Sequence, residues 1–265
     1  MNYEKWDEIL APYQHAVEEL KVKFKNIRKE FLTKGEYSPI EFVTGRTKKI
    51  SSIISKANRL DTNDIEGKID DIAGIRIMCQ FVEDIYTIVE LIKNRTDMTV
   101  INEKDYITNF KESGYRSYHL IIKYPINSIA GSKEIHCEIQ IRTLAMNFWA
   151  TIEHSLKYKY EHYIPENVAL RLRKAADAAF LLDEEMSEIR EDIMKAQVMY
   201  QVKSVTLRDV LDKIQELYNV GETHKAIKYQ RRLDKIDNER DITEILQLKK
   251  EIDSLLQEYK NKVDD

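Results

Sequence analysis

The sequence predicts an α+β fold, in which a mixed β-sheet of about five strands is flanked by helices and followed by a helical C-terminal extension. Three observations support this prediction. The 265 residues include only 7 glycines and 4 prolines, which indicates few long loops. Apolar residues recur at helical spacing at both ends of the chain, while its middle holds short runs rich in β-branched residues. Strand and helix patterns alternate in that middle part, as in a sheet covered by helices.

The N-terminal half begins with a long amphipathic segment. Residues 6–31 place apolar side chains at steps of three and four, which predicts a helix. We expect a second helix over 46–60 and a turn or short helix over 63–70. The run 72–79, IAGIRIMC, is too short for a typical buried helix and predicts a central strand. Residues 83–94 return to helical spacing.

The C-terminal half begins with two more strands. Residues 118–124 and 133–142 alternate between apolar and polar side chains, and the turn Ala130-Gly131-Ser132 separates them. From Leu144 onward the pattern is helical. We expect one domain over residues 1–196 and a helical extension over 197–265. The last part, from about Val205, is charge-dense with loose heptads, as in a helical hairpin or coiled coil.

Composition limits the classes of function. The formal net charge is −4, so a phosphate site needs a local cluster of basic residues. The chain starts without the basic and apolar regions of a secretory signal, and no run approaches the ~18 apolar residues of a membrane span. We therefore expect a cytoplasmic protein without a membrane partner. Cys79 and Cys137 each lie in an apolar run and are expected to be buried thiols.

The densest basic stretch is the segment 42–60, FVTGRTKKISSIISKANRL, which contains no acidic residue. Polyphosphate binding requires several cations that converge, and arginine can contact two oxygens at once. A solvated basic face is the alternative interpretation. The basic residues of this segment are Arg46, Lys48, Lys49, Lys56 and Arg59.

Two carboxylates, Asp70 and Asp71, precede the strand at 72–79, and Arg76 follows on that strand. Mg²⁺ prefers carboxylate oxygens and leaves room for substrate phosphates. Gly74 would allow a close approach to the backbone. An aspartate at the edge of a strand is also a common turn former, so the motif alone leaves both interpretations open.

The segment 111–119, KESGYRSYH, presents an aromatic ring and a guanidinium from a tight turn before a strand. The ring of Tyr115 is suited to stacking on a nucleobase, and His119 to bonding a phosphate. Taken singly, a packing tyrosine and a core histidine are the alternatives.

Strict alternation over 135–142 places one row of polar side chains on one face of a strand: His136, Glu138, Gln140 and Arg142. This row either faces solvent or lines a cleft. A carboxylate, an amide and a guanidinium would suit metal, base-edge and phosphate contacts. The following helix carries Asn147.

The order of these motifs, GRTKK, DDIAGIRI, KESGYRSYH and EIQIRTLAMNFWATIEHSLKYKY, resembles the synthetase domain of the RelA/SpoT-homologue family. More narrowly it resembles the stand-alone small alarmone synthetases of the RelQ type, from about Tyr3 to Ala196. The resemblance implies a nucleotidyltransferase-like fold. It also implies transfer of the β,γ-pyrophosphate of ATP to the 3′-hydroxyl of GDP or GTP, which gives AMP and the alarmones ppGpp or pppGpp.

The resemblance further implies the roles of individual residues, with Mg²⁺ as the cofactor. Asp71 and Glu138 would be catalytic and hold the metal, and Glu138 would also activate the 3′-hydroxyl. The residues implied for ATP are Arg46, Lys48, Lys56, Arg59 and Arg76. Those implied for GDP or GTP are Lys104, Lys111, Tyr115, His119, Gln140 and Asn147.

Regulation is expected to come from assembly. RelQ-type members form homotetramers whose central cleft binds (p)ppGpp as an allosteric effector, and a solvated basic helix face is the alternative. None of the six histidines is followed by aspartate, so the His-Asp pair of the family's hydrolase domain is missing and we expect synthesis only. Single-stranded RNA is left open as a partner. The residues that resemble the effector site are Lys21, Lys25, Arg28, Glu41, Phe42 and Thr44.

Two other functions are compatible with parts of this pattern. A nucleotidyltransferase acting on RNA or a small molecule would normally cluster more than two metal carboxylates on adjacent strands. An RNA-binding oligomer of the same fold that has lost catalysis is the other alternative. Asp71 and Glu138 are both intact, which favours the enzyme.

Overall fold

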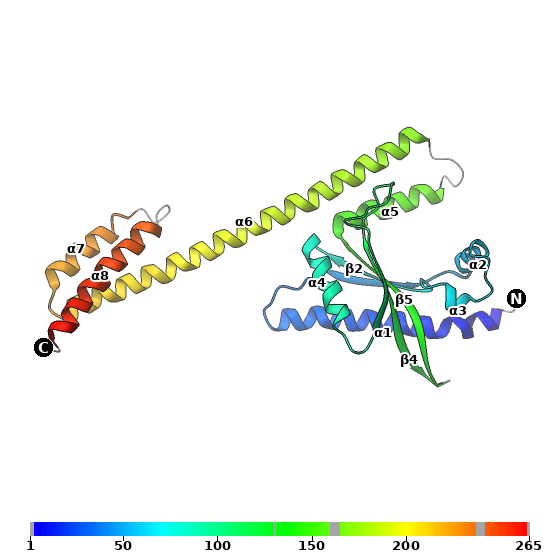
Figure 1. The fold of residues 1–265 in the computed structure, drawn as a ribbon, viewed down its shortest axis with the longest axis horizontal. Helices are drawn as coiled ribbons and strands as arrows, with labels where there is room; N and C mark the ends of the chain where they lie inside the picture. Colours follow the sequence, from blue (N-terminus) through cyan, green and yellow to red (C-terminus); the bar gives the residue numbers. More distant parts are fainter. Residues whose placement is uncertain (1–2, 130, 160–164, 237–241, 264–265) are drawn as a thin grey trace. The chain divides into compact units, whose positions relative to one another are not determined.

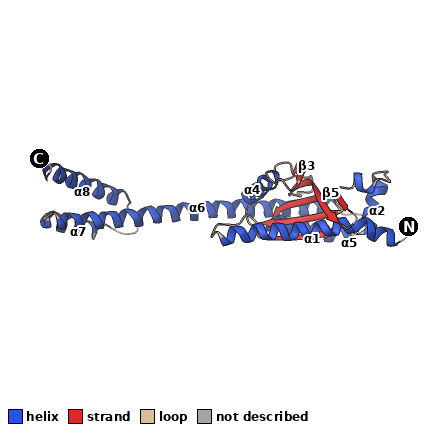
Figure 2. Ribbon diagram, turned by 90° about the horizontal axis from the view of Figure 1, so that it is seen from below, coloured by secondary structure: helices blue, strands red, loops and turns tan. Residues whose placement is uncertain are grey.

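The computed structural model describes residues 3–129, 131–159, 165–236 and 242–263 (Figures 1 and 2). The chain divides into two compact units, Met1–Glu188 and Ile189–Asp265. The helix α6, Glu166–Asn219, contributes to both. The domain boundary predicted at Ala196 also falls within α6 and stays a prediction.

The first unit starts with the long helix α1, Tyr3–Thr33, which confirms the predicted N-terminal helix. The predicted central strand is β2, and the predicted helix after it is α4. Residue Ala130 of the expected turn lies outside the described residues. The remaining elements are β1 (Phe42–Thr47), α2 (Ile50–Arg59), α3 (Ile65–Lys68), β2 (Ala73–Cys79), α4 (Val82–Lys93), β3 (Thr99–Asp105), β4 (Tyr118–Ser128), β5 (Gly131–Thr143) and α5 (Leu144–Lys159).

The five strands form one mixed sheet in the order β1-β2-β5-β4-β3. The central pair β2 and β5 is parallel, and the other neighbours are antiparallel. This arrangement confirms the predicted α+β class with its mixed sheet.

The sheet has one apolar face and one polar face. On β5, Ile135, Cys137, Ile139 and Ile141 are buried in a core that also includes side chains of α1 and α4. Helix α1 runs along the sheet (Figure 1). A Cβ atom on Gly45 would lie 2.9 Å from Val17 Cγ1, so this glycine allows α1 to pack closely on β1. The polar residues between the buried positions face the other side.

Two of the five strands, β1 and β3, were not predicted from the sequence. The predicted helix 46–60 is wrong in its first part, because Arg46 belongs to β1 and pairs with Gly74 of β2. Ladder pairing along a hydrophobic strand outweighs the helical spacing of the lysines and arginines there. The strand β3 lies at the sheet edge, and its largely exposed residues, TVINEKD, lack the alternation that marks a half-buried strand.

The second unit has its own apolar core. The end of α6 packs there with α7, Thr223–Leu233, and α8, Ile242–Val263. The predicted hairpin is therefore three helical segments. No helix in the described ranges is both long and apolar enough to cross a membrane. The core is built from Val210, Ile214, Leu217, Ala226, Ile245, Leu248, Ile252 and Leu256.

Candidate active site

A cavity of about 260 Å³ opens on the polar face of the sheet, over the adjacent strands β1, β2 and β5. Gly74 lies between Arg46 and Glu138 in the strand register, so a residue without a side chain separates a guanidinium from a carboxylate. Arg76 is the register partner of Gln140. Glu138 and Gln140 of the polar row on β5 therefore line a cleft, whereas His136 bonds Asp70 outside it. The cavity is lined by Thr44, Gly45, Arg46, Asp71, Gly74, Ile75, Arg76, Glu138 and Gln140.

Asp71 is held by two lysines. Lys48 Nζ lies 2.6 Å from its Oδ2, and Lys56 Nζ lies 2.9 Å from its Oδ1. Burial by itself would raise the pKa of Asp71, but the hydrogen bonds and charges of the two lysines outweigh burial and lower the pKa. Asp71 is therefore ionised at neutral pH, and the loop after β1 and the helix α2 converge on it.

Glu138 is held by a histidine and an amide. His119 Nδ1 lies 2.9 Å from Glu138 Oε1, and Gln140 Nε2 donates to Oε2 at 2.8 Å. Burial would raise the pKa of Glu138, but these contacts outweigh it and the pKa is lowered. The charge of Asp71 acts in the opposite direction on Glu138, so the two carboxylates are near enough to repel. That repulsion and the oxygen donors suit a divalent cation.

The tight turn before β4 presents Tyr115 beside these groups. Gly114 adopts φ +87°, and a Cβ there would lie 2.5 Å from Ala176 Cβ, so the turn requires glycine. Tyr115 Oη lies 2.8 Å from His119 Nε2. Lys111 Nζ lies 5.0 Å from the centroid of the Tyr115 ring, which places a cation beside the aromatic face. The predicted group Lys111, Tyr115 and His119 is thus brought together.

Three predicted residues lie outside this cluster. Arg59 is exposed at the end of α2, one turn beyond Lys56. Lys104 is exposed on the edge strand β3, where it is the register partner of His119. Asn147 is half-buried near the start of α5, the helix whose Trp149 forms a small apolar cluster against which Tyr115 packs.

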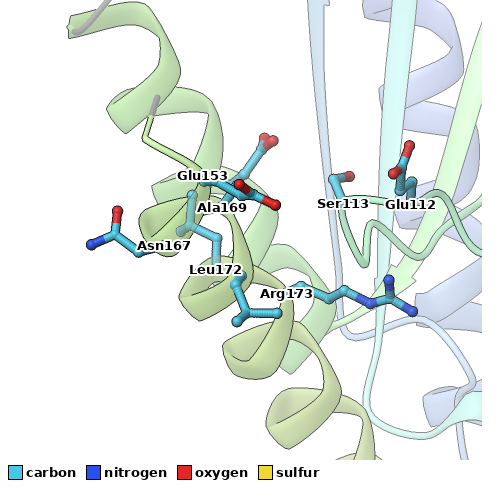
Figure 3. A pocket seen from close by; sticks show the side chains of 9 residues that line it. Glu112, Ser113, Glu153, Asn167, Ala169, Leu172 and Arg173 are labelled. Atoms are coloured by element: carbon cyan, nitrogen blue, oxygen red, sulfur yellow. The ribbon is translucent and has the colours of Figure 1, made fainter. Parts of the chain in front are cut away.

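A second, larger cavity of about 760 Å³ lies between the loop at Glu112 and Ser113, α5 and the first turns of α6 (Figure 3). Its charged lining is three carboxylates, those of Glu112, Glu153 and Glu166, with the single guanidinium of Arg173. Carboxylates repel a polyphosphate, so the smaller cavity with Arg46 and Arg76 is the better phosphate site despite its size.

Known proteins are similar to this chain in sequence. The family model described as the region found in RelA / SpoT proteins matches residues 45–163. The GTP pyrophosphokinase YjbM of Bacillus subtilis (strain 168) is 55% identical over 205 residues, which are 77% of this chain and 97% of that protein. The chain belongs to the RelA/SpoT family.

Solved structures agree with this membership. Small alarmone synthetase 1 from Bacillus subtilis, bound to its product pppGpp, is 56% identical, with a TM-score of 0.69 over 72% of this chain and 98% of that one. A GTP pyrophosphokinase family protein from Streptococcus pneumoniae is 52% identical, with a TM-score of 0.70 over 75% of this chain and 98% of that one. The resemblance to small alarmone synthetases is confirmed, and so is the fold.

The effector residues of RelQ-type members, as predicted here, do not form one site within a single chain. Lys21 lies beside Gly45 on the α1 side of the sheet, whereas Thr44 lines the cavity on the opposite face. Arg28 Nε donates to the carbonyl of Ile40 at 3.0 Å. The others are Lys25, exposed on α1, Glu41, which accepts from Gln80, and Phe42, exposed on β1.

Arg142, whose guanidinium was considered only for a phosphate contact, is not among the predicted site residues. The residue is 3% exposed, and its Nη2 donates to Tyr115 Oη at 3.0 Å. The signal was present, because Arg142 continues the row of Glu138 and Gln140 on β5. Its proximity to Tyr115, which lies in the turn before β4, depends on the tertiary structure.

Proposed function

We propose that this RelA/SpoT-family member transfers the β,γ-pyrophosphate of ATP to the 3′-hydroxyl of GDP or GTP, forming AMP and ppGpp or pppGpp. Its class, a GTP pyrophosphokinase, follows from its family and its relatives. The observation that carries the proposal is the single cavity in which Asp71 and Glu138 meet Arg46 and Arg76. Pyrophosphoryl transfer depends on positioning and charge neutralisation, which such a cavity supplies.

ATP is proposed to bind on the β1 and α2 side of the cavity. Arg46 on β1 and Arg76 on β2 would contact ATP from neighbouring strands, since both line the cavity. Lys48 and Lys56, now paired with Asp71, would neutralise phosphate oxygens. Arg59 would join from the exposed end of α2.

Asp71 and Glu138 are the proposed ligands of Mg²⁺. Two carboxylates that line one cavity and repel one another fit this cation, which binds proteins through one or two carboxylates and fills its other positions with water and phosphate oxygens. When bound, Mg²⁺ would neutralise charge on the transferred group. The described residues hold no cluster of three or more His, Cys, Asp or Glu side chains suited to a metal.

The guanine nucleotide is proposed to bind against Tyr115. Its ring would stack on the base, while Gln140 and Asn147 would read the base edge. The phosphates of the acceptor would contact Lys104, Lys111 and His119, and the first two of these are exposed. Glu138 would accept the proton of the 3′-hydroxyl, because its lowered pKa keeps it ionised at neutral pH.

Product analysis tests the reaction. Purified protein incubated with ATP, Mg²⁺ and GDP or GTP should release AMP and form ppGpp or pppGpp, as detected by mass spectrometry. Release of pyrophosphate instead would identify a nucleotidyltransferase.

Glu138→Gln should abolish turnover while GDP binding persists. Incubation of ppGpp alone should yield no hydrolysis, as expected for a synthetase without the His-Asp pair.

Self-association as a homotetramer is proposed from the exposed apolar side chains of α6. Ile193, Val198 and Tyr200 are 54%, 59% and 75% exposed, more apolar surface than a solvated helix normally carries. An alarmone effector would then bind between copies, near Lys25. Analytical ultracentrifugation of the wild type and of Ile193→Lys tests the assembly.

Kinetics test the effector. The wild type should show sigmoidal kinetics, and added pppGpp should make them hyperbolic. Adding single-stranded RNA to the same kinetic assay tests RNA as a partner.

A further inference from the structure

Arg142 is a buried cation to which the proposed function gives no role. Only 3% of its surface is exposed, and its Nε has no hydrogen-bond partner in the described structure. Desolvation lowers the pKa of its guanidinium. A buried guanidinium that no carboxylate pairs with is costly, so its retention calls for a physical reason.

The contacts of Arg142 reach two residues of the site. Nη2 donates to Tyr115 Oη at 3.0 Å and to Gln140 Oε1 at 2.5 Å. The guanidinium carbon lies 5.5 Å from the centroid of the Tyr115 ring. One nitrogen of Arg142 therefore joins the aromatic ring on the loop to the amide on β5.

These contacts close a ring of hydrogen bonds. Tyr115 is joined to His119, His119 to Glu138, Glu138 to Gln140, and Gln140 through Arg142 back to Tyr115. Arginine can only donate, so Tyr115 Oη accepts from Arg142. The ionised Glu138 can only accept, so the shared proton sits on His119 Nδ1, and Nε2 of a neutral His119 then accepts the Tyr115 proton.

The orientation of Gln140 follows from the same geometry. Its Oε1 accepts from Arg142 and, at 3.2 Å, from Arg76 Nε. The amide nitrogen is therefore turned toward Glu138 Oε2. Each oxygen of the Glu138 carboxylate thus has one fixed donor, and Arg142 is the residue that sets the direction on both sides of the ring.

We propose that Arg142 is a positioning residue that holds Tyr115 and the Glu138 carboxylate in one mutual geometry. The proposal rests on the proposed function, in which Tyr115 stacks on the guanine of the acceptor nucleotide and Glu138 accepts the proton of its 3′-hydroxyl. Because one guanidinium contacts Tyr115 and orients Glu138 through Gln140, the position of the guanine nucleotide and the position of the carboxylate that takes its proton are fixed together. Small errors in such positioning lower the reaction rate strongly.

Arg116 is a matched control within the same chain. It is also buried, at 7% exposed, and its Nε also lacks a partner in the described structure. Its Nη2 lies 3.1 Å from Asp177 Oδ1, and its guanidinium carbon lies 4.3 Å from the Phe110 ring and 4.5 Å from the Phe180 ring. Its Nη1 also donates to the Gly114 carbonyl at 3.2 Å, so Arg116→Met deletes a buried guanidinium that contacts the turn before Tyr115 but makes no hydrogen bond to a side chain of the ring.

Steady-state kinetics of Arg142→Met, Arg142→Lys, Tyr115→Phe and Arg116→Met, with melting temperatures, test the proposal. Arg142→Met should lower kcat/KM for GDP about 10- to 100-fold, the effect of losing one or two charge-assisted hydrogen bonds, and leave KM for ATP within about twofold. Arg142→Lys should recover part of the loss. Arg142→Met combined with Tyr115→Phe should lose less than the product of the single effects, because both break one ring.

A second measurement does not depend on turnover. Nitrogen-15 NMR of the histidine side chains, with His119 assigned from His119→Gln, should show a neutral Nδ1–H tautomer in the wild type and mixed tautomers in Arg142→Met and Tyr115→Phe. Unchanged tautomers in Arg142→Met and Tyr115→Phe, additive kinetics, or the same tautomer change in Arg116→Met would overturn the proposal. A wild type that makes no alarmone would instead refute the proposed function, while the tautomer still decides whether the ring exists.

Discussion

The two carboxylates in the cavity are kept ionised by different neighbours. Asp71 is ionised because two lysines hold it, whereas Glu138 is ionised because a histidine and an amide donate to it. The lysines beside Asp71 are proposed to turn to phosphate when ATP binds. The donors of Glu138 come from its own strand and the neighbouring strand, so the sheet itself positions this carboxylate.

Replacing Asp71 with Asn should lower kcat about 100-fold or more, because the metal and Lys48 and Lys56 lose a common charged partner. Release of AMP over a range of Mg²⁺ concentrations measures the effect. Asp70→Asn is the matched control. Asp70 bonds His136 at 2.7 Å and does not line the cavity, so this variant should keep activity within about threefold. Equal losses in both variants would contradict the assignment of Asp71.

Turns and helix ends decide how the elements present these residues. The turn at Gly114 faces Ala176 of α6, so Gly114→Ala adds a strained φ and a steric clash. We expect a loss of about 1–3 kcal/mol in the free energy of unfolding. We also expect a higher KM for GDP with little change in KM for ATP, because Tyr115 follows the turn directly. Denaturant unfolding and kinetics measure the two effects, and an unchanged KM for GDP would contradict the proposed role of the turn.

The first part of α6 carries a buried carboxylate. Asp183 accepts a 2.6 Å hydrogen bond from Thr143 at the end of β5. Burial raises its pKa to about 6, and the charge of Glu83 adds to the shift. The folded state therefore binds a proton more tightly than the unfolded state, whose aspartate has a pKa of about 3.9. Stability is lost as the pH rises from about 4 to 6 and stays reduced above that range.

Asp183→Asn removes this cost and keeps an oxygen that accepts from Thr143. It should raise the free energy of unfolding by about 1–3 kcal/mol at pH 7, with a gain that shrinks to nothing near pH 4. Asp177→Asn, on the same helix, should lower stability instead, because it removes the negative charge that pairs with the buried guanidinium of Arg116. Urea unfolding at pH 4, 6 and 8 measures both, and a gain for Asp183→Asn that did not depend on pH would contradict the linkage.

The whole molecule consists of two units with separate apolar cores. The residues of the cavity all lie between Thr44 and Gln140, within the first unit. A chain that ends at Val205 should therefore keep kcat within about threefold and lose only the core that starts at Val210. Circular dichroism and AMP release measure the outcome. A loss of more than tenfold would show that the second unit contributes to the reaction.

Sequence periodicity and motifs determined a large part of this protein. The apolar alternation of residues 135–142 specified both the strand β5 and the polar row that lines the cavity, because side chains alternate faces along any strand. The order of four motifs identified the family before any geometry was known. The charged, exposed strand β3 carried no such signal, and the basic residues at 46–60 gave a helical spacing that starts where β1 ends.

Only the tertiary structure decided which polar residues meet. Lys48 and Asp71 are 23 positions apart, and Tyr115 and Arg142 are 27 apart, so nothing in local spacing predicts their contacts. The pairing of β2 with β5 places Gly74 beside Glu138 and thereby opens the cavity. Hydrogen-bond direction, burial and charge balance are properties of that assembled face. The sequence therefore determined the strands and their chemistry, and the packing of the sheet decided the site.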